Sequence, residues 1–236
     1  VYDEKWHELF KDSFSYEYPY QAEGTIPAKL TVSEIKRMQS ADTEESEMLL
    51  EEETEEIVPL FMQETKEELK GAARGTLYHR VWENLDYEKI DTKEQIEEQL
   101  ENILTAEEKK SIWIPDFYRF AKNPLAVRMK EAAQKGQLYR EQPFVIAMPA
   151  NQMKKEYETE EEILVQGIID AYFEEEDGLV LVDYKTDKVQ KGQEKELIEK
   201  YKVQMQYYKK ALEMITDREV KEVYIYSSGL GKAVLV

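Results

Sequence analysis

Two hydrophobic periods alternate along the chain, and each predicts a different kind of element. Apolar residues recur every three to four positions in helical segments and every second position in strands. The helical repeat covers 66–86, 92–134 (interrupted at Pro115 and Pro124) and 194–215. Strand alternation covers 138–148, 163–173, 179–186 and 219–227. This order of helices, three strands, helix and strand predicts an α/β domain built on a mixed sheet.

Two neighbouring strand segments form a predicted hairpin that carries acidic residues. Asp177-Gly178 separates two β-branched apolar runs, and such a pair favours a tight turn. Asp170 belongs to the first run and Asp183 to the second. Lys185 follows Asp183 by two positions, so both side chains point to one face. Two acids and a lysine at one sheet edge are costly unless they hold a metal or a substrate, so the hairpin predicts a divalent-metal site.

Other polar residues are candidates for the same site. His79 and Glu83 lie four apart on the predicted helix 66–86, hence on one face. A lone histidine on a helix is more often structural, but beside an acidic hairpin imidazole is a common metal ligand. Glu141, near the start of the strand 138–148, either joins the site or is an exposed edge charge. Gln204 and Tyr208 share the inward face of the last helix, where a glutamine needs a specific partner.

An aromatic cluster lies within the helical segment 92–134. Its members are Trp113, Phe117, Tyr118 and Phe120. Such a cluster can stack unpaired bases. Because aromatic clusters more often pack in the interior, we interpret this one as part of the hydrophobic core.

The N-terminal part of the chain differs in composition from the rest. Residues 29–37 predict a short strand that enters a helix, with Ser33 as its N-cap. Residues 42–56 are an acidic run, which predicts a solvated linker or, alternatively, an interaction tail. We therefore expect a connecting segment with an acidic linker at 1–64 and a folded domain at 65–236.

Composition and charge limit the possible functions. The chain has 236 residues, is 42% hydrophobic and contains no cysteine, which excludes disulfides and thiolate metal sites. It has no apolar run long enough for a membrane span and no signal peptide, so we expect a cytoplasmic protein. The net charge of −19 argues against a nucleic-acid partner. However, residues 1–65 carry most of that excess, so the remainder is only mildly acidic.

The candidate residues suit the hydrolysis of a phosphodiester. That reaction needs an activated water and relief of negative charge, both of which Mg²⁺ or Mn²⁺ bound by carboxylates can provide. Asp170, Asp183 and His79 are the expected side-chain ligands, and the backbone carbonyl of Tyr184 is available between Asp183 and Lys185. Lys185 can orient or help deprotonate the water, or steady the phosphate.

Four short motifs together resemble a known family. They are Gly75-Thr76-Leu77-Tyr78-His79, Gly167-Ile168-Ile169-Asp170, Val182-Asp183-Tyr184-Lys185-Thr186 and Gln204-Met205-Gln206-Tyr207-Tyr208. This set resembles the RecB-type nuclease family of the PD-(D/E)XK superfamily, although Ile169 stands where the superfamily name places proline. The resemblance implies a restriction-endonuclease-like α/β fold, a mixed central sheet flanked by helices, here with an N-terminal extension.

The resemblance also implies roles for individual residues. Metal ligation falls to the residues at His79, Asp170 and Asp183, and catalysis to Lys185. Gln204, Tyr208 and, as an open candidate, Glu141 are the remaining site residues. Mg²⁺ is the expected cofactor, with Mn²⁺ as the alternative.

The family further implies a cellular role. It implies a DNA exonuclease domain of a helicase–nuclease complex that processes double-strand-break ends for recombinational repair. The expected partners are a single strand of unwound DNA and a second protein of the AddB type. ATP is expected to serve only a motor outside this chain, because Gly229-Leu230-Gly231-Lys232 lacks the spacing of a phosphate-binding loop. The alternative is a catalytically inactive nuclease fold that guides DNA or serves as a docking scaffold for a partner.

Overall fold

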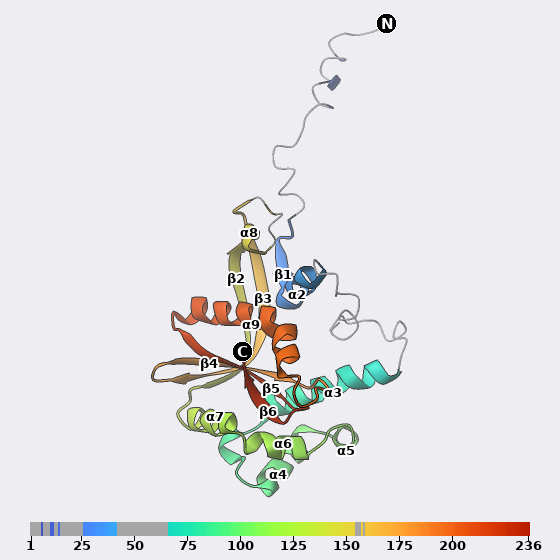
Figure 1. Ribbon diagram of the computed structural model, residues 1–236, viewed down its shortest axis with the longest axis vertical. Coiled ribbons are helices and arrows are strands. Elements are labelled where there is room, and N and C mark those ends of the chain that lie inside the picture. The colour runs from blue at the N-terminus through green and yellow to red at the C-terminus, as the bar shows by residue number, and fades with distance from the viewer. Residues whose placement is uncertain are drawn as a thin grey trace. The chain divides into compact units, whose positions relative to one another are not determined.

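The computed structural model describes residues 6, 10–11, 14, 26–41, 66–153, 157 and 159–236 (Figure 1). Its helices are α2 (Val32–Ala41), α3 (Lys66–Asn84), the 3₁₀ helix η4 (Tyr87–Lys89), α4 (Lys93–Ile103), α5 (Ala106–Lys109), α6 (Pro115–Ala121), α7 (Pro124–Gln134), α8 (Ala150–Met153) and α9 (Glu194–Thr216). Its strands are β1 (Lys29–Thr31), β2 (Leu138–Pro149), β3 (Glu162–Glu175), β4 (Gly178–Lys185), β5 (Val220–Ser227) and β6 (Lys232–Leu235). The acidic run predicted as a linker, 42–56, lies outside the described residues.

The chain divides into two compact units. The smaller comprises Val1–Leu30 and Ala147–Val165, and the larger comprises Thr31–Ile146 and Gln166–Val236. Within the described part of the smaller unit, the N–H of Leu164 donates to the carbonyl of Ala28 at 3.1 Å. All side chains of the candidate site belong to the larger unit.

The sheet has six strands in mixed orientation. The strand order is β1-β3-β4-β5-β6, and β2 pairs with β3. β3 and β4 are antiparallel, β4 and β5 are parallel, and β5 and β6 are antiparallel. Parallel pairing needs a crossover, which α9 supplies between β4 and β5. The predicted mixed α/β sheet flanked by helices is therefore confirmed. Strand β6 was not predicted, because four residues are too few to show a clear alternation.

Strand β4 is buried on both faces, which explains its almost entirely apolar sequence. On one face, Val180, Val182 and Tyr184 join the main hydrophobic core with side chains from α3, α4, α6 and α7. The alternate residues point to the opposite face, where Asp183 contacts Gln204 of α9. Figure 1 shows strands β4 to β6 between α9 and the helices α6 and α7. The sheet thus separates an apolar face from the face that carries the acids.

Local sequence signals explain most of the boundaries between elements. Pro115 and Pro124, predicted as breaks, stand at the starts of α6 and α7, where a missing N–H costs nothing. The predicted N-cap of α2 is wrong by two residues. Thr31, not Ser33, accepts from the N–H of Glu34 at 3.2 Å, and the Glu34 carboxylate accepts from the Thr31 N–H at 2.7 Å. This reciprocal pair is a capping box.

The predicted hairpin forms with its turn shifted by one residue. Glu175 pairs with Gly178, so Glu176 and Asp177 make the two-residue loop. Gly178 has a φ of 151°, a conformation that side-chain-bearing residues rarely adopt. The glycine is therefore required at the first position of β4 rather than inside the turn.

The predicted aromatic cluster is divided between core and surface. Phe117 and Phe120 are fully buried. They lie in the main hydrophobic core, which also contains Trp82 and Tyr184, whose rings stack with centroids 4.4 Å apart. Trp113 is 63% exposed, so its assignment to the core is wrong. The helical period could not reveal this, because Trp113 precedes α6 and lies outside any helix.

Among the described residues, no helix is both long and apolar enough to cross a membrane.

Candidate metal centre

The hairpin of β3 and β4 brings two carboxylates together. Continuing the register that pairs Ala171 with Val182 places Asp170 across from Asp183. The backbone N–H of Tyr184 donates to Asp170 Oδ2 at 2.8 Å, which fixes that carboxylate at the end of the hairpin. Its other oxygen, Oδ1, lies 3.5 Å from Nδ1 of His79 on α3.

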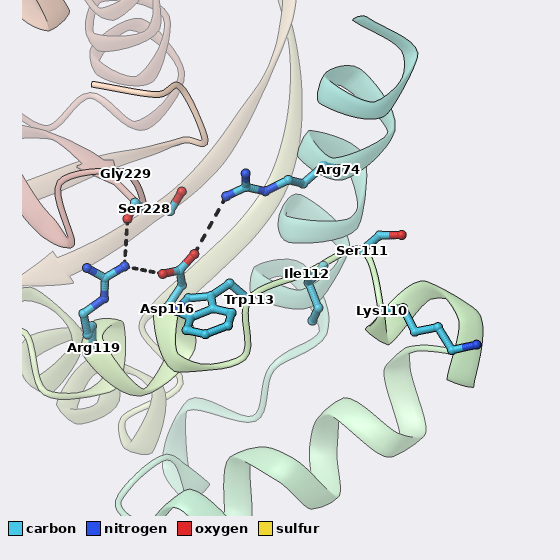
Figure 2. Close-up of a pocket in the computed structure, with 9 residues that line it drawn as sticks. All are labelled: Arg74, Lys110, Ser111, Ile112, Trp113, Asp116, Arg119, Ser228 and Gly229. Atoms are coloured by element: carbon cyan, nitrogen blue, oxygen red, sulfur yellow. Dashed lines mark hydrogen bonds and ion pairs between the residues drawn. The ribbon is translucent and has the colours of Figure 1, made fainter. Parts of the chain in front are cut away.

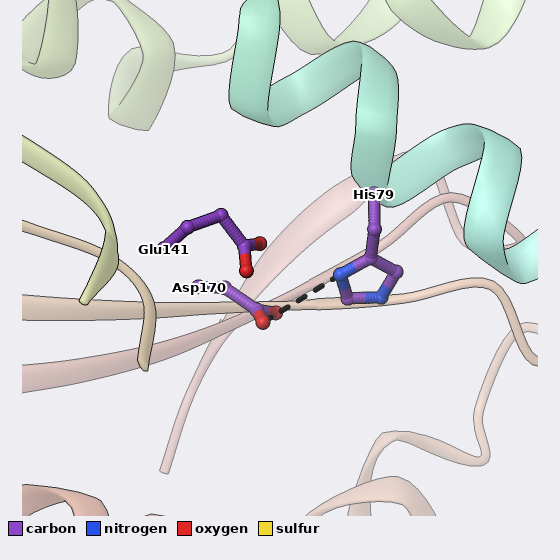
Figure 3. A group of neighbouring side chains, drawn as sticks. All are labelled: His79, Glu141 and Asp170. Atoms are coloured by element: carbon purple, nitrogen blue, oxygen red, sulfur yellow. Dashed lines mark ion pairs between the residues drawn. The ribbon is translucent and has the colours of Figure 1, made fainter. Parts of the chain in front are cut away.

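Glu141 completes a group of three candidate ligands with His79 and Asp170 (Figure 3). One ligand atom of each residue lies within 4.8 Å of the other two. Glu141 has a φ of 46°, an uncommon backbone conformation for a glutamate, and such strain concentrates at functional sites. Of the two placements left open by the sequence, the structure has Glu141 beside the histidine rather than isolated at an edge.

Asp183 lies beside this group but is oriented toward Lys185 and α9. Its side chain is 1% exposed, and its Oδ2 lies 3.2 Å from Lys185 Nζ. The amide of Gln204 donates to Asp183 Oδ1 at 3.5 Å and to the Tyr208 hydroxyl at 3.0 Å. Asp183, Lys185, Gln204 and Tyr208 are therefore connected by hydrogen bonds and an ion pair beside the His79, Glu141 and Asp170 group.

Burial and mutual charge separate the pKa values of the titratable groups. Burial raises the pKa of Asp183 to about 7; Lys185 opposes this rise and the charge of Asp170 adds to it. Burial would also raise the pKa of Asp170, but the charges of His79 and Lys185 more than offset it and hold that pKa below its usual value. Burial lowers the pKa of His79, and the carboxylate of Asp170 reverses that effect and raises it. Neighbouring acids with separated pKa values are typical of catalytic sites.

Comparison with known proteins identifies the family. The profile of the PD-(D/E)XK nuclease superfamily matches residues 44–233. The chain belongs to this superfamily. That membership, predicted from the four motifs, is confirmed.

Curated relatives match this chain over a small part of a longer protein. An ATP-dependent helicase/nuclease subunit from Acetivibrio thermocellus is 41% identical over 90% of this chain and 17% of its own length. Its counterparts of the same name from Thermoanaerobacter sp. (strain X514) and Lachnoclostridium phytofermentans are 42% and 35% identical over 95% and 94% of this chain. The chain thus spans about a fifth of the length of the curated relatives it matches.

The donor set of this nuclease site fits a divalent cation. PD-(D/E)XK nucleases usually use divalent metals, and carboxylate oxygens with one imidazole nitrogen suit Mg²⁺ or Mn²⁺. Asp183 Oδ2 is buried, and its charged neighbour in the described part of the chain is Lys185 Nζ at 3.2 Å. Burying two carboxylates beside one ammonium is costly, and a divalent cation would offset that cost.

Tyr201 is a contact of the nuclease site that the sequence patterns did not reveal. Lys185 Nζ lies 4.4 Å from the centroid of its ring, and Lys36 Nζ of α2 lies 4.3 Å from the same centroid. The Tyr201 hydroxyl donates to Asp187 at 2.9 Å, which fixes the ring. Tyr201 precedes Gln204 by three residues on α9, and that shared helix face was the available signal.

Proposed function

We propose that this chain is the metal-dependent DNA exonuclease domain of a helicase–nuclease complex that processes double-strand-break ends for recombinational repair. The observation that carries the proposal is the convergence of His79, Glu141 and Asp170 beside the Asp183–Lys185 pair. The relatives are named as parts of ATP-dependent helicase/nucleases, and these names support the association with a motor.

In this proposal His79, Asp170 and Asp183 would hold Mg²⁺, or Mn²⁺, and the Tyr184 carbonyl would be a further ligand. Glu141 lies close enough to His79 and Asp170 to share in binding. The cation, when bound, lowers the pKa of a water and neutralises charge that develops on the phosphate. The carboxylates of Asp170 and Asp183 would hold the cation at the end of the β3–β4 hairpin.

Lys185 is the proposed catalytic lysine. Its ammonium lies between the Asp183 carboxylate and the Tyr201 ring, so it is held at the end of β4. There it orients the attacking water and stabilises negative charge on the phosphate oxygens. Gln204 positions Asp183 through its amide and is itself positioned by the Tyr208 hydroxyl.

The partners follow from the same proposal. The substrate is a single strand released from unwound duplex, and an AddB-type protein completes the complex in the bacterial cytoplasm. ATP serves the motor rather than this site. Residues 65–236 are the nuclease domain, and residues 1–64 connect it to the helicase part.

The test is cleavage of an end-labelled single-stranded oligonucleotide by the 236-residue chain with Mg²⁺, Mn²⁺ or EDTA. We expect Asp183→Ala and Lys185→Ala each to lower the rate at least about a hundredfold, because each removes a group from the reacting centre. Lys202→Ala is the control, since Lys202 is an exposed lysine on α9 paired only with Glu199 at 3.6 Å in the described structure.

Either variant cutting at the wild-type rate would refute the assignment of the site. A wild-type chain that binds DNA but cuts none with either metal would favour the inactive scaffold. Metal binding is followed separately by the Mn²⁺-induced rise in melting temperature, which His79→Ala should reduce.

A further inference from the structure

A pocket of about 430 Å³ lies on α3, on the segment before α6 and on the turn after β5 (Figure 2). Its cationic lining residues are Arg74, Lys110 and Arg119, and Asp116 is the acid among the lining residues. A chain of net charge −19 therefore presents a locally positive surface here. Such a surface suits an anionic ligand.

Asp116 organises the cations of the pocket. Its side chain is buried, and its Oδ2 accepts from the Tyr78 hydroxyl at 2.6 Å. Arg119 donates to the other oxygen of Asp116, and Arg74 lies 3.9 Å from Oδ2. Figure 2 shows both guanidinium groups directed at this one carboxylate. One negative charge cannot neutralise two guanidinium groups, so the pocket keeps positive charge in a fixed geometry.

Trp113 presents an exposed aromatic surface in the same pocket. Its side chain is 63% exposed, although its backbone N–H donates to the Tyr78 hydroxyl at 3.1 Å. The backbone is thus tied to the core while the indole remains open. An exposed ring beside several cations is the arrangement with which proteins bind unpaired nucleotides, since the ring stacks a base and the cations hold phosphates.

The buried hydroxyl of Ser228 independently indicates that the pocket binds a ligand. It is 1% exposed, and its hydroxyl has no hydrogen-bond partner in the described ranges. Its carbonyl accepts from Arg119 at 3.3 Å, so the residue is held against the pocket. A buried hydroxyl without a partner is costly, and a phosphate or sugar oxygen in the pocket would remove that cost.

The pocket adjoins the metal centre through the backbone. The N–H of Ser228 donates to the carbonyl of Lys185 at 2.9 Å, and the strands β4 and β5 end side by side. On α3, Tyr78, whose hydroxyl bonds Asp116 of the pocket, directly precedes His79 of the metal centre. Backbone neighbours on α3 and at the ends of β4 and β5 therefore belong one to the pocket and one to the metal centre.

We propose that this pocket is a subsite for an unpaired nucleotide of the DNA strand that flanks the scissile phosphate. The inference rests on the proposed nuclease function and extends it. The Trp113 indole stacks on the base, Arg74 and Arg119 attract a phosphate inside the pocket, and the Ser228 hydroxyl bonds a phosphate or sugar oxygen. Lys110, whose side chain points outward in Figure 2, attracts the strand at the outer edge of the pocket. The subsite holds the strand in register while the metal centre cuts it.

The experiment measures binding apart from cleavage. A fluorescently labelled single-stranded oligonucleotide is titrated with the 236-residue chain in EDTA, and its anisotropy is recorded. We expect Trp113→Ala to weaken binding roughly tenfold and Trp113→Phe to retain most of the affinity, because phenylalanine still stacks. Lys110→Ala should weaken binding several-fold.

Lys202→Ala is the matched control for Lys110→Ala. Each lysine is exposed and pairs with a glutamate three residues earlier, Lys110 with Glu107 at 2.8 Å and Lys202 with Glu199 at 3.6 Å. Both changes alter the net charge equally, so only a local role of Lys110 separates them. Trp113 is largely exposed, so its truncation should leave the thermal unfolding curve unchanged, and that curve is recorded for each variant.

Wild-type affinity in Trp113→Ala, or equal weakening by Lys110→Ala and Lys202→Ala, would overturn the subsite; the exposed indole would then be assigned to a protein partner. The two proposals fail separately. If the chain cuts DNA but Trp113→Ala binds it as well as wild type does, only the subsite proposal is refuted. If the chain cuts no DNA but needs Trp113 to bind oligonucleotides, only the proposed nuclease function is refuted.

Discussion

Asp183 is a carboxyl group whose surroundings favour its neutral form in the absence of metal. It is buried beside Asp170, and these effects raise its pKa to about 7 despite the nearby Lys185. The folded chain therefore holds this proton at pH values where the unfolded chain has released it. A divalent cation would replace the proton and allow both acids to be ionised together.

The stability of the metal-free chain should depend on this proton. Because the folded pKa lies above the unfolded value, Asp183 costs no stability below pH 4 and lowers stability as the pH rises toward 7. We expect Asp183→Asn to be more stable than wild type at pH 8 in EDTA, by on the order of 1–3 kcal/mol. The advantage should shrink as the pH falls toward 4.

Thermal unfolding followed by circular dichroism between pH 4 and 8 measures this difference. Added Mg²⁺ should raise the wild-type melting temperature more than that of Asp183→Asn. A difference between the two proteins that stays constant over this pH range would show that Asp183 is ionised throughout.

At the scale of elements, Gly167 allows β2, β3 and α9 to meet behind the site. A Cβ on Gly167 would lie 2.8 Å from two ring atoms of Phe144 and 3.1 Å from a ring atom of Tyr208. The two rings are buried and pack edge to face with centroids 5.7 Å apart. Because both rings are buried, a Cβ at Gly167 would push them away, and the glycine therefore leaves room for the Tyr208 ring and its hydroxyl.

Gly167→Ala should therefore lower both stability and activity. We expect a loss of about 1–3 kcal/mol from overpacking, and slower cleavage because Tyr208 and Gln204 move together. The control is Gly71→Ala on α3, where a Cβ meets no atom within 4 Å among the described residues. That change should stabilise the helix by up to about 1 kcal/mol. Urea unfolding and oligonucleotide cleavage test the pair; equal stability of the two variants would contradict the steric argument.

The elements were predictable where a local signal is strong. The alternation around Asp177-Gly178 located β3 and β4, and the apolar stripe of α9 placed Gln204 and Tyr208 on one inward face. These patterns depend only on the geometry of a single element or hairpin.

The rest depends on contacts between distant segments. Tyr201 meets Lys185 only because α9 packs on the sheet, and the backbone of Trp113 is held by the hydroxyl of Tyr78 on the distant helix α3. Glu141 lies near His79 with a positive φ, a backbone conformation that the neighbouring residues in the sequence do not predict. Periodicity contains none of this information.

At the scale of the whole molecule, the net charge of the chain is negative, whereas the residues proposed to contact DNA are positive. The net charge of −19 repels DNA, but salt at 0.1 M screens this repulsion beyond about 10 Å. The cations of the pocket act at contact, where phosphate binding releases counterions. At physiological salt, these local contacts should therefore affect DNA affinity more than the net charge of the chain does.

We accordingly expect affinity for a single-stranded oligonucleotide to fall as KCl rises from about 50 to 200 mM. The slope of the logarithm of the binding constant against the logarithm of the KCl concentration should be shallow. Its magnitude should be about 0.7 smaller in Lys110→Ala, because one phosphate contact is lost. Lys202→Ala should leave the slope unchanged. Anisotropy titrations at several salt concentrations give these slopes, and an affinity that rises with salt would show that the overall charge prevails.

Helix α3 serves both the metal centre and the pocket, which has a consequence for sequence change in this protein. Arg74 and Tyr78 are one turn apart and face Asp116, whereas His79, the next residue, is turned toward Asp170. One inserted residue between positions 74 and 79 would rotate Arg74 by about 100° relative to His79. The number of residues between Arg74 and His79 is therefore constrained by the two sites that they serve. Deletions and insertions should therefore be tolerated in the loops of this protein and absent from this turn and a half of helix.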